Sequence, residues 1–137
     1  MSKLILMSIK TKYAKEIFNG TKKYEYRRKS IGEKNLNNKI YIYSSQEEKA
    51  IIGYIIIDKI LEGDINHILK ETNNLNNKDL IDYFECSSKC FALQIKEYVK
   101  LDNPIKFDDI KKIDRNFNVP QFYRYIKDNE YLYKLLK

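Results

Sequence analysis

The sequence contains few residues of the kinds that break secondary structure, form disulfide bonds or bind metal ions. Its 137 residues include four glycines, two prolines, two cysteines, one histidine and no tryptophan. So few glycines and prolines argue against flexible linkers and disordered tails. Cys86 and Cys90 are too few for a disulfide framework, and with His67 they do not complete a closed zinc site. We therefore expect neither a bound metal ion nor a cofactor.

Long apolar runs are also missing. The run at residues 50–57 falls far short of the roughly 20 residues that span a bilayer, and Asp58 ends it. The first residues look superficially like a signal peptide, but Ser8 and Lys10 interrupt the apolar run and no small-residue cleavage site follows. We therefore expect a cytoplasmic protein with reduced cysteines and no contact with a membrane.

Negative charge is in deficit. The 26 Lys and Arg residues outnumber the 19 Asp and Glu residues and give a formal net charge of +7. Such an excess favours an anionic partner and raises the rate of association with nucleic acid. An acidic protein would meet the same surface, so charge alone does not identify the partner.

The periodicity of apolar residues predicts a mixed fold. Alternation predicts strands over residues 3–9, 22–28, 39–45, 50–60 and 90–99. Helical spacing predicts a helix from Thr11 that ends at Gly20, two short helices between residues 63 and 85, and a closing helix over 129–136. Gly53 predicts a bulge, and Pro104 predicts an edge or turn. Residues 1–137 thus form one α+β domain, a small β-barrel of five to six strands with an N-terminal helix, inserted helices and a short C-terminal helix.

The second expected strand has two different faces. Tyr24 and Tyr26 alternate with charged residues, and we expect both tyrosines in the core. Lys22, Glu25 and Arg27 are then expected to face a cleft. The alternative is that Glu25 and Arg27 only pair with charges on neighbouring strands, where exposed pairs contribute little.

The same segment carries a family resemblance. Residues 20–27 contain Gly20, Lys22, Glu25 and Arg27 at the spacing Gly-x-Lys-x-x-Glu-x-Arg. This resembles the signature of the ASCH domains of the PUA-like superfamily. The resemblance extends to residues 40–45, 52–53, 83–84 and 119–125. It implies a PUA-like β-barrel with a cleft beside the motif, in a superfamily dominated by RNA binding and by recognition of modified nucleosides.

The residue chemistry permits such a ligand. Lysine and arginine side chains can meet phosphates or base edges, Glu25 can accept from an exocyclic amine, and a tyrosine such as Tyr43 or Tyr123 can stack on a base. We therefore predict a binding module for RNA, a nucleotide or a modified nucleoside. The candidate ligand-binding residues are Ser8, Lys10, Lys22, Glu25, Arg27, Arg28, Tyr43, Ser44, Ser45, Gln121 and Tyr123.

Two alternatives stay open. The first is a small hydrolase, either a ribonuclease or an amidohydrolase of acetylated cytidine, with Lys22 catalytic. The resemblance places Lys22 on the catalytic lysine of those amidohydrolases and Glu71 loosely on their acidic residue, but Glu25 stands where they keep a threonine hydroxyl. The second alternative is a regulatory module that binds an acidic protein.

Overall fold

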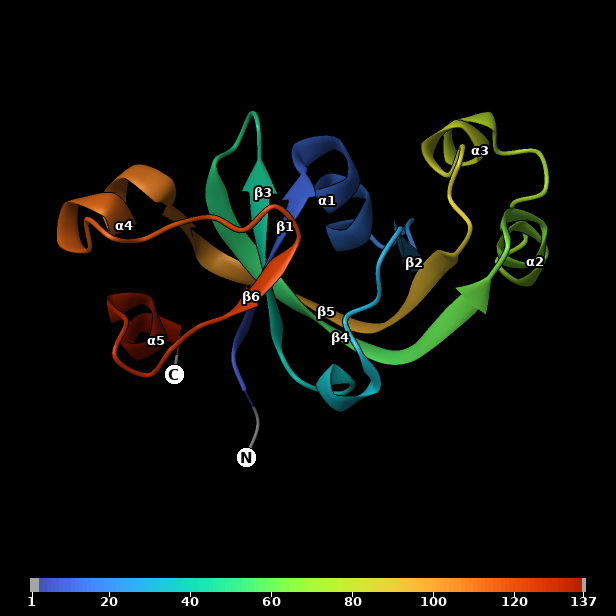
Figure 1. Ribbon diagram of the computed structural model, residues 1–137. Helices are drawn as coiled ribbons and strands as arrows, with labels where there is room; N and C mark the ends of the chain where they lie inside the picture. The colour runs from blue at the N-terminus through green and yellow to red at the C-terminus, as the bar shows by residue number, and fades with distance from the viewer. Residues whose placement is uncertain (1–2, 137) are drawn as a thin grey trace.

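The structure is a computed structural model, and it describes residues 3–136 (Figure 1). Within this range the chain forms six strands, five α-helices and one 3-10 turn. The strands are β1 (Ile5–Lys10), β2 (Tyr24–Arg27), β3 (Ile40–Ser45), β4 (Ala50–Gly63), β5 (Cys90–Lys106) and β6 (Tyr123–Tyr125). The helices are α1 (Thr11–Phe18), α2 (Ile65–Glu71), α3 (Lys78–Tyr83), α4 (Phe107–Ile113) and α5 (Tyr131–Leu136), and the 3-10 turn is η1 (Glu33–Asn35).

The strands form one curled sheet, a half-barrel. Its strand order is β2-β5-β4-β3-β1-β6, and among the strands of residues 3–136 only β1 and β3 pair in parallel. The long strands β4 and β5 sweep across the molecule, and helices α4 and α5 lie at one end of the sheet while α2 and α3 lie at the other (Figure 1). The predicted α+β fold, with five to six strands, a helix near the N-terminus, inserted helices and a closing helix, is confirmed.

Side chains alternate along each strand, so both faces of the sheet carry apolar side chains, and helices cover both faces. Ile5, Met7 and Ile9 of β1 pack with α1 in one core cluster, whereas Leu6 packs on the other face with residues of α4 and α5. A third cluster joins α2 and α3 to the start of β5, around Phe84. The inserted helices thus have a core of their own beside β2.

The two features expected at glycines, a helix end and a bulge, are present. Gly20 follows α1 with a φ of +85°, in the left-handed region that glycine tolerates. At Gly53 the registers of β4 with β3 and with β5 both shift, which is the predicted bulge.

The region around Pro104 differs from the prediction. The strand expected to end at residue 99 continues to Lys106. Residues 101–104 bulge out between the pairs Gly53–Lys100 and Ile51–Ile105, and pairing with β4 resumes at Ile105. Pro104 lies in this bulge, so its missing N–H removes no bond from the ladder. Helix α4, which follows, was not predicted. Its first turn carries Asp108 and Asp109 and its last turn is basic, a charge pattern that favours a helix.

No helix within residues 3–136 has the length and apolar character needed to cross a bilayer.

Candidate functional site

A cleft of about 550 Å³ opens between α1, β2 and the segment that joins α2 to α3. It is mostly polar, and three parts of the chain contribute to its wall. Tyr13 and Glu16 lie on α1, Lys22 lies between α1 and β2, and β2 supplies Tyr24, Glu25, Tyr26 and Arg27. The inserted segment supplies Asn73, Asn74 and Asn77 between α2 and α3, and Asp79 and Tyr83 on α3. The cleft therefore lies beside the Gly-x-Lys-x-x-Glu-x-Arg motif.

A buried carboxylate organises the charges at this cleft. Glu25 is 5% exposed, and its Oε2 accepts a hydrogen bond from Arg27 Nε at 2.8 Å. Its other oxygen, Oε1, lies 3.7 Å from Lys22 Nζ. Arg27 also donates from Nη2 to the Ser8 carbonyl oxygen at 2.6 Å, and its guanidinium lies 4.8 Å from the centre of the Phe122 ring. Arg27 is thus held by a carboxylate, a backbone carbonyl and an aromatic ring, whereas the contacts of the Lys22 ammonium within the described residues are with Glu25 and aromatic rings.

Aromatic rings surround the lysine. Lys22 Nζ lies 4.8 Å from the centre of the Tyr26 ring and 5.3 Å from the centre of the Tyr13 ring, which are cation–π distances. The Tyr26 hydroxyl accepts a hydrogen bond from Asn74 Nδ2 at 2.8 Å, so the inserted segment is tied to β2. Burial raises the pKa of the Tyr26 and Tyr83 phenols above the ordinary value of 10.0, so both rings stay neutral at physiological pH.

Arg28 lies on the far side of Tyr83. Its Nε and Nη2 donate to the Tyr83 carbonyl oxygen at 3.1 and 2.6 Å, and its guanidinium lies 4.5 Å from the centre of the Tyr83 ring. Arg28 is exposed and is not among the residues that line the cleft, so its contact with Tyr83 lies outside the cleft wall.

Four of the predicted site residues meet at the cleft. Lys10, Lys22, Glu25 and Arg27 all line it, and the last two lie on one face of β2. The other face of that strand was partly misassigned. Tyr24 and Tyr26 are half-buried and pack against the cluster of α2 and α3, but they also line the cleft and do not enter the main core.

The predicted serines are structural. Ser8 is 8% exposed and donates from Oγ to the Pro120 carbonyl oxygen at 2.7 Å. Ser44 is fully buried and donates from Oγ to Glu48 Oε1 at 2.7 Å, and Ser45 donates to the Ile9 carbonyl oxygen at 3.3 Å. None of the three is among the residues that line the cleft.

The predicted stacking residues also lie elsewhere. Tyr43 is 5% exposed and packs edge-on against Phe107 of α4, so it offers no face to a base. Tyr123 is half-buried against the main core, with its hydroxyl 3.4 Å from the Ile31 carbonyl oxygen. Gln121 is exposed outside the cleft. From this C-terminal segment it is Phe122, the neighbour of both, that reaches the motif.

Other residues of the cleft were missed. Tyr13 was assigned to the apolar face of the first helix but is 37% exposed above Lys22. Asp79 of α3 lines the cleft, whereas Glu71, the expected acidic residue, is exposed outside it. In the sequence, Asn73, Asn74 and Asn77 are visible only as a break between two short helices. The signal that could have identified them as cleft residues is their position before a helix that ends in aromatic residues.

Comparison with known proteins identifies the family and agrees with the fold. The sequence model of the ASCH domain matches residues 7–110. An ASCH domain-containing ribonuclease from Zymomonas mobilis is 30% identical over 128 residues, which cover 91% of this chain and 85% of that protein. A crystal structure of ASCH from Zymomonas mobilis superposes with a TM-score of 0.84 at 28% identity, covering 98% of this chain and 94% of that one. The N-terminal domain of Staphylothermus marinus McrB has a similar fold, with a TM-score of 0.61 at 19% identity over 96% of this chain and 92% of that domain. The chain belongs to the ASCH domain family.

Proposed function

We propose that this protein binds single-stranded RNA and that the cleft beside β2 is the binding site. The observation that carries the proposal is the position of Lys22, whose ammonium lies between the rings of Tyr13 and Tyr26. Every nucleotide has a phosphate, which an ammonium group attracts, and a flat base, on which an aromatic ring stacks. The name of the Zymomonas mobilis relative, a ribonuclease, also points to RNA.

The polar wall of the cleft fits the edges of unpaired bases. Asn73 supplies an amide, Asn74 offers its Oδ1 because its Nδ2 donates to Tyr26, and Asn77 offers its Nδ2 because its Oδ1 accepts from Leu80 N–H. Asp79 supplies a carboxylate. Bases of single-stranded RNA expose their faces to aromatic rings and their hydrogen-bonding edges to such groups, whereas a duplex hides both. Single-stranded RNA is therefore the form that the cleft suits.

Binding can be measured with a fluorescent 2′-O-methyl oligoribonucleotide, which resists cleavage through the 2′-oxygen. Lys22→Gln should weaken binding about tenfold or more, because a charge-assisted contact contributes about 1.5–3 kcal/mol. The control is Lys112→Gln, which removes the same charge from an exposed position on α4, at the other end of the sheet. No affinity of the wild-type protein at low salt, or an equal loss in both variants, would overturn the proposal.

RNA cleavage is the second candidate function. It is favoured by the ribonuclease name of a relative that aligns with 91% of this chain, and by the distance of 3.7 Å between Lys22 Nζ and Glu25 Oε1. This distance supports the proposal, because an ammonium and a carboxylate lie side by side at one wall of the cleft. In the proposed step the 2′-oxygen of the RNA bonds to the adjacent phosphorus and the bond from phosphorus to the 5′-oxygen breaks. Glu25 takes the 2′-hydroxyl proton and Lys22 gives a proton to the leaving 5′-oxygen. Transfer of a proton from Glu25 to Lys22 then restores both groups.

The products test this chemistry. Cleavage should give a 2′,3′-cyclic phosphate and a 5′-hydroxyl, should fail on 2′-O-methyl RNA, and should be lost in both Glu25→Gln and Lys22→Gln. Circular dichroism and binding of the 2′-O-methyl oligonucleotide establish that the Glu25→Gln variant is folded. Turnover of free acetylated cytidine in place of RNA would instead support an amidohydrolase, and binding of an acidic protein with no affinity for RNA would support a regulatory module.

A further inference from the structure

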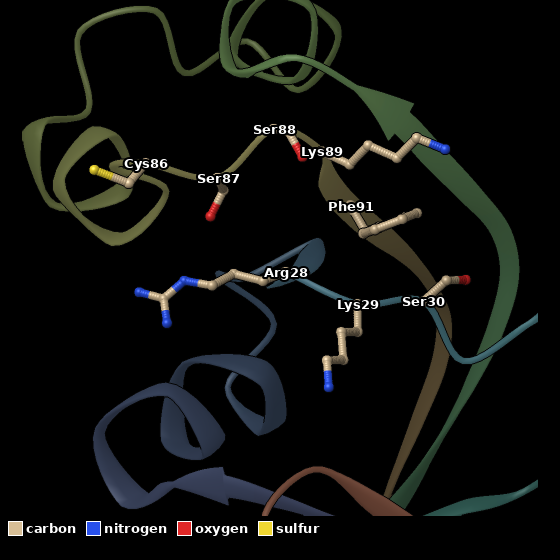
Figure 2. Close-up of a pocket in the computed structure, with 8 residues that line it drawn as sticks. All are labelled: Arg28, Lys29, Ser30, Cys86, Ser87, Ser88, Lys89 and Phe91. Carbon is tan, nitrogen blue, oxygen red and sulfur yellow. The ribbon is translucent and has the colours of Figure 1, made fainter.

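A second groove lies next to the cleft. It has a volume of about 500 Å³ and opens between the residues that follow β2 and the loop that joins α3 to β5 (Figure 2). Phe91, only 8% exposed, lies at its base. The lining residues are Arg28, Lys29, Ser30, Cys86, Ser87, Ser88, Lys89 and Phe91.

The groove and the cleft share a wall. Tyr83 lines the cleft, and Arg28, which lines the groove, donates two hydrogen bonds to the Tyr83 carbonyl oxygen and covers the Tyr83 ring. An extended chain that leaves the cleft over this contact therefore enters the groove directly. Arg28 Nη1 takes no part in these two bonds, and the side chain is exposed.

The charges of the groove are of one sign and are spread out. Three of the eight lining residues are cationic and none is acidic. Figure 2 shows their charged ends directed to different sides, with Arg28 towards one side, Lys89 towards the other and Lys29 away from the α3–β5 loop. Lys89 Nζ lies 3.2 Å from a carboxylate oxygen of Glu62, but both side chains are more than half exposed, so this pair contributes little.

This spread decides which anion fits. A single phosphate or a free nucleotide needs donors that converge on one point, and these cations do not. Successive phosphates of a polynucleotide need cations at intervals along a track, with hydroxyl groups such as that of Ser87 beside them.

We infer that single-stranded RNA bound in the cleft continues over the Arg28–Tyr83 contact into this groove, where its backbone phosphates meet Arg28, Lys29 and Lys89. The inference rests on the proposed function, because it names the length and the path of the RNA that occupies the same site. The protein then reads bases in the cleft and holds the backbone in the groove.

Oligonucleotide length tests the inference. A 2′-O-methyl oligonucleotide of about twelve nucleotides should bind on the order of tenfold more tightly than one of about four nucleotides. The variant Lys29→Gln/Lys89→Gln should lose this gain and should lower the slope of log affinity against log salt by about 0.7 for each lost contact. Both lysines are exposed, so the fold tolerates the change. The control Lys112→Gln/Lys134→Gln removes the same charge from exposed positions on α4 and α5 and should keep the gain.

Cys86 supplies a readout that needs no substitution. It lines the groove and is exposed, whereas Cys90 is fully buried and burial raises the pKa of its thiol. The long oligonucleotide should slow alkylation of Cys86 by iodoacetamide and the short one should not. Polyglutamate of similar length should not reproduce this protection.

The outcomes separate the two proposals. Equal affinity for both lengths with no protection of Cys86 overturns the groove but leaves the cleft as an RNA site. Equal protection by polyglutamate overturns the groove as an RNA path, because the surface then holds any polyanion. Failure to bind either oligonucleotide overturns the proposed function itself.

Discussion

Glu25 and Arg27 form an ion pair within one strand, with Arg27 Nε donating to Glu25 Oε2 at 2.8 Å. Residues two apart on a strand point to the same face, so the pair forms without help from another strand. The same guanidinium donates to the Ser8 carbonyl oxygen of β1. Strand β2 is one edge of the sheet, and β1 lies next to the opposite edge, so this bond links the two sides of the half-barrel. The motif therefore closes the fold as well as lining the cleft.

Stability should depend on both members of this pair. Arg27→Gln leaves the buried carboxylate without its closest donor, and Glu25→Gln leaves the guanidinium without its carboxylate. Each should lower the free energy of unfolding by about 1–3 kcal/mol in urea denaturation. The double variant should lose less than the sum, with a coupling of about 0.5–3 kcal/mol.

The exposed pair of Lys89 and Glu62 is the matched control. Glu62→Gln removes one carboxylate at a distance of 3.2 Å but at the surface, so the change should stay below about 1 kcal/mol. A loss for Glu25→Gln as small as that for Glu62→Gln would contradict the structural role of the buried pair.

Tyr13 should contribute to RNA affinity through its ring. It is 37% exposed, and Lys12 Nζ and Lys22 Nζ lie 5.6 and 5.3 Å from the centre of its ring, so a base that meets the ring also meets these cations. Tyr13→Ala should weaken binding of a 2′-O-methyl oligonucleotide by about 1–3 kcal/mol. Tyr13→Phe keeps the ring and should bind nearly as the wild type does, measured by fluorescence anisotropy. Equal losses in both variants would mean that the hydroxyl rather than the ring contacts the RNA.

The positions of Tyr26 and Tyr43 show how much of the site could be predicted from the sequence. Both lie in alternating strands, and local pattern predicts for both that one face of the strand differs from the other. What covers each face depends on distant segments. Tyr43 is buried because α4 packs Phe107 against it, and α4 was not predicted, whereas Tyr26 borders the cleft because the inserted helices pack beside it.

The backbone devices were more predictable than the site. Gly20 and Gly53 lack a Cβ, and this local property restricts where such residues are useful, so a helix end and a bulge could be inferred without tertiary knowledge. Ser8, Ser44 and Ser45 have no such restriction. A serine hydroxyl bonds either to a ligand or to the protein, and only the position of the Pro120 carbonyl decides for Ser8.

The buried tyrosines predict a loss of stability at high pH. Burial raises the pKa of Tyr26, Tyr41, Tyr43 and Tyr83 above the ordinary 10.0. The neutral phenol is therefore favoured in the folded state, and its contribution is fully present below about pH 10. As pH rises further the unfolded chain loses these protons first, so stability falls by up to about 1.4 kcal/mol per pH unit for each group.

Urea midpoints measured across this range check the sign. The midpoint should not depend on these phenols below about pH 10 and should fall above it. Tyr43→Phe removes one of the four groups and should make the fall less steep. A midpoint that rises above pH 10, or a slope unchanged in Tyr43→Phe, would contradict the assignment of burial as the cause.

Gly53 and Gly32 should respond differently to alanine. A Cβ at Gly53 would overlap the Val99 carbonyl oxygen and the Phe18 ring, and the backbone atom cannot move aside without breaking the β4–β5 ladder. At Gly32 nothing lies within 4 Å of the added carbon, so only its φ of +83° opposes the change, at about 1–2 kcal/mol. In Gly53→Ala the steric overlap should lower the free energy of unfolding by about 1–3 kcal/mol, or the variant should fail to fold. In thermal melts the Gly53→Ala variant should unfold at a lower temperature than Gly32→Ala, and equal melting temperatures would mean that the bulge relaxes to accept a side chain.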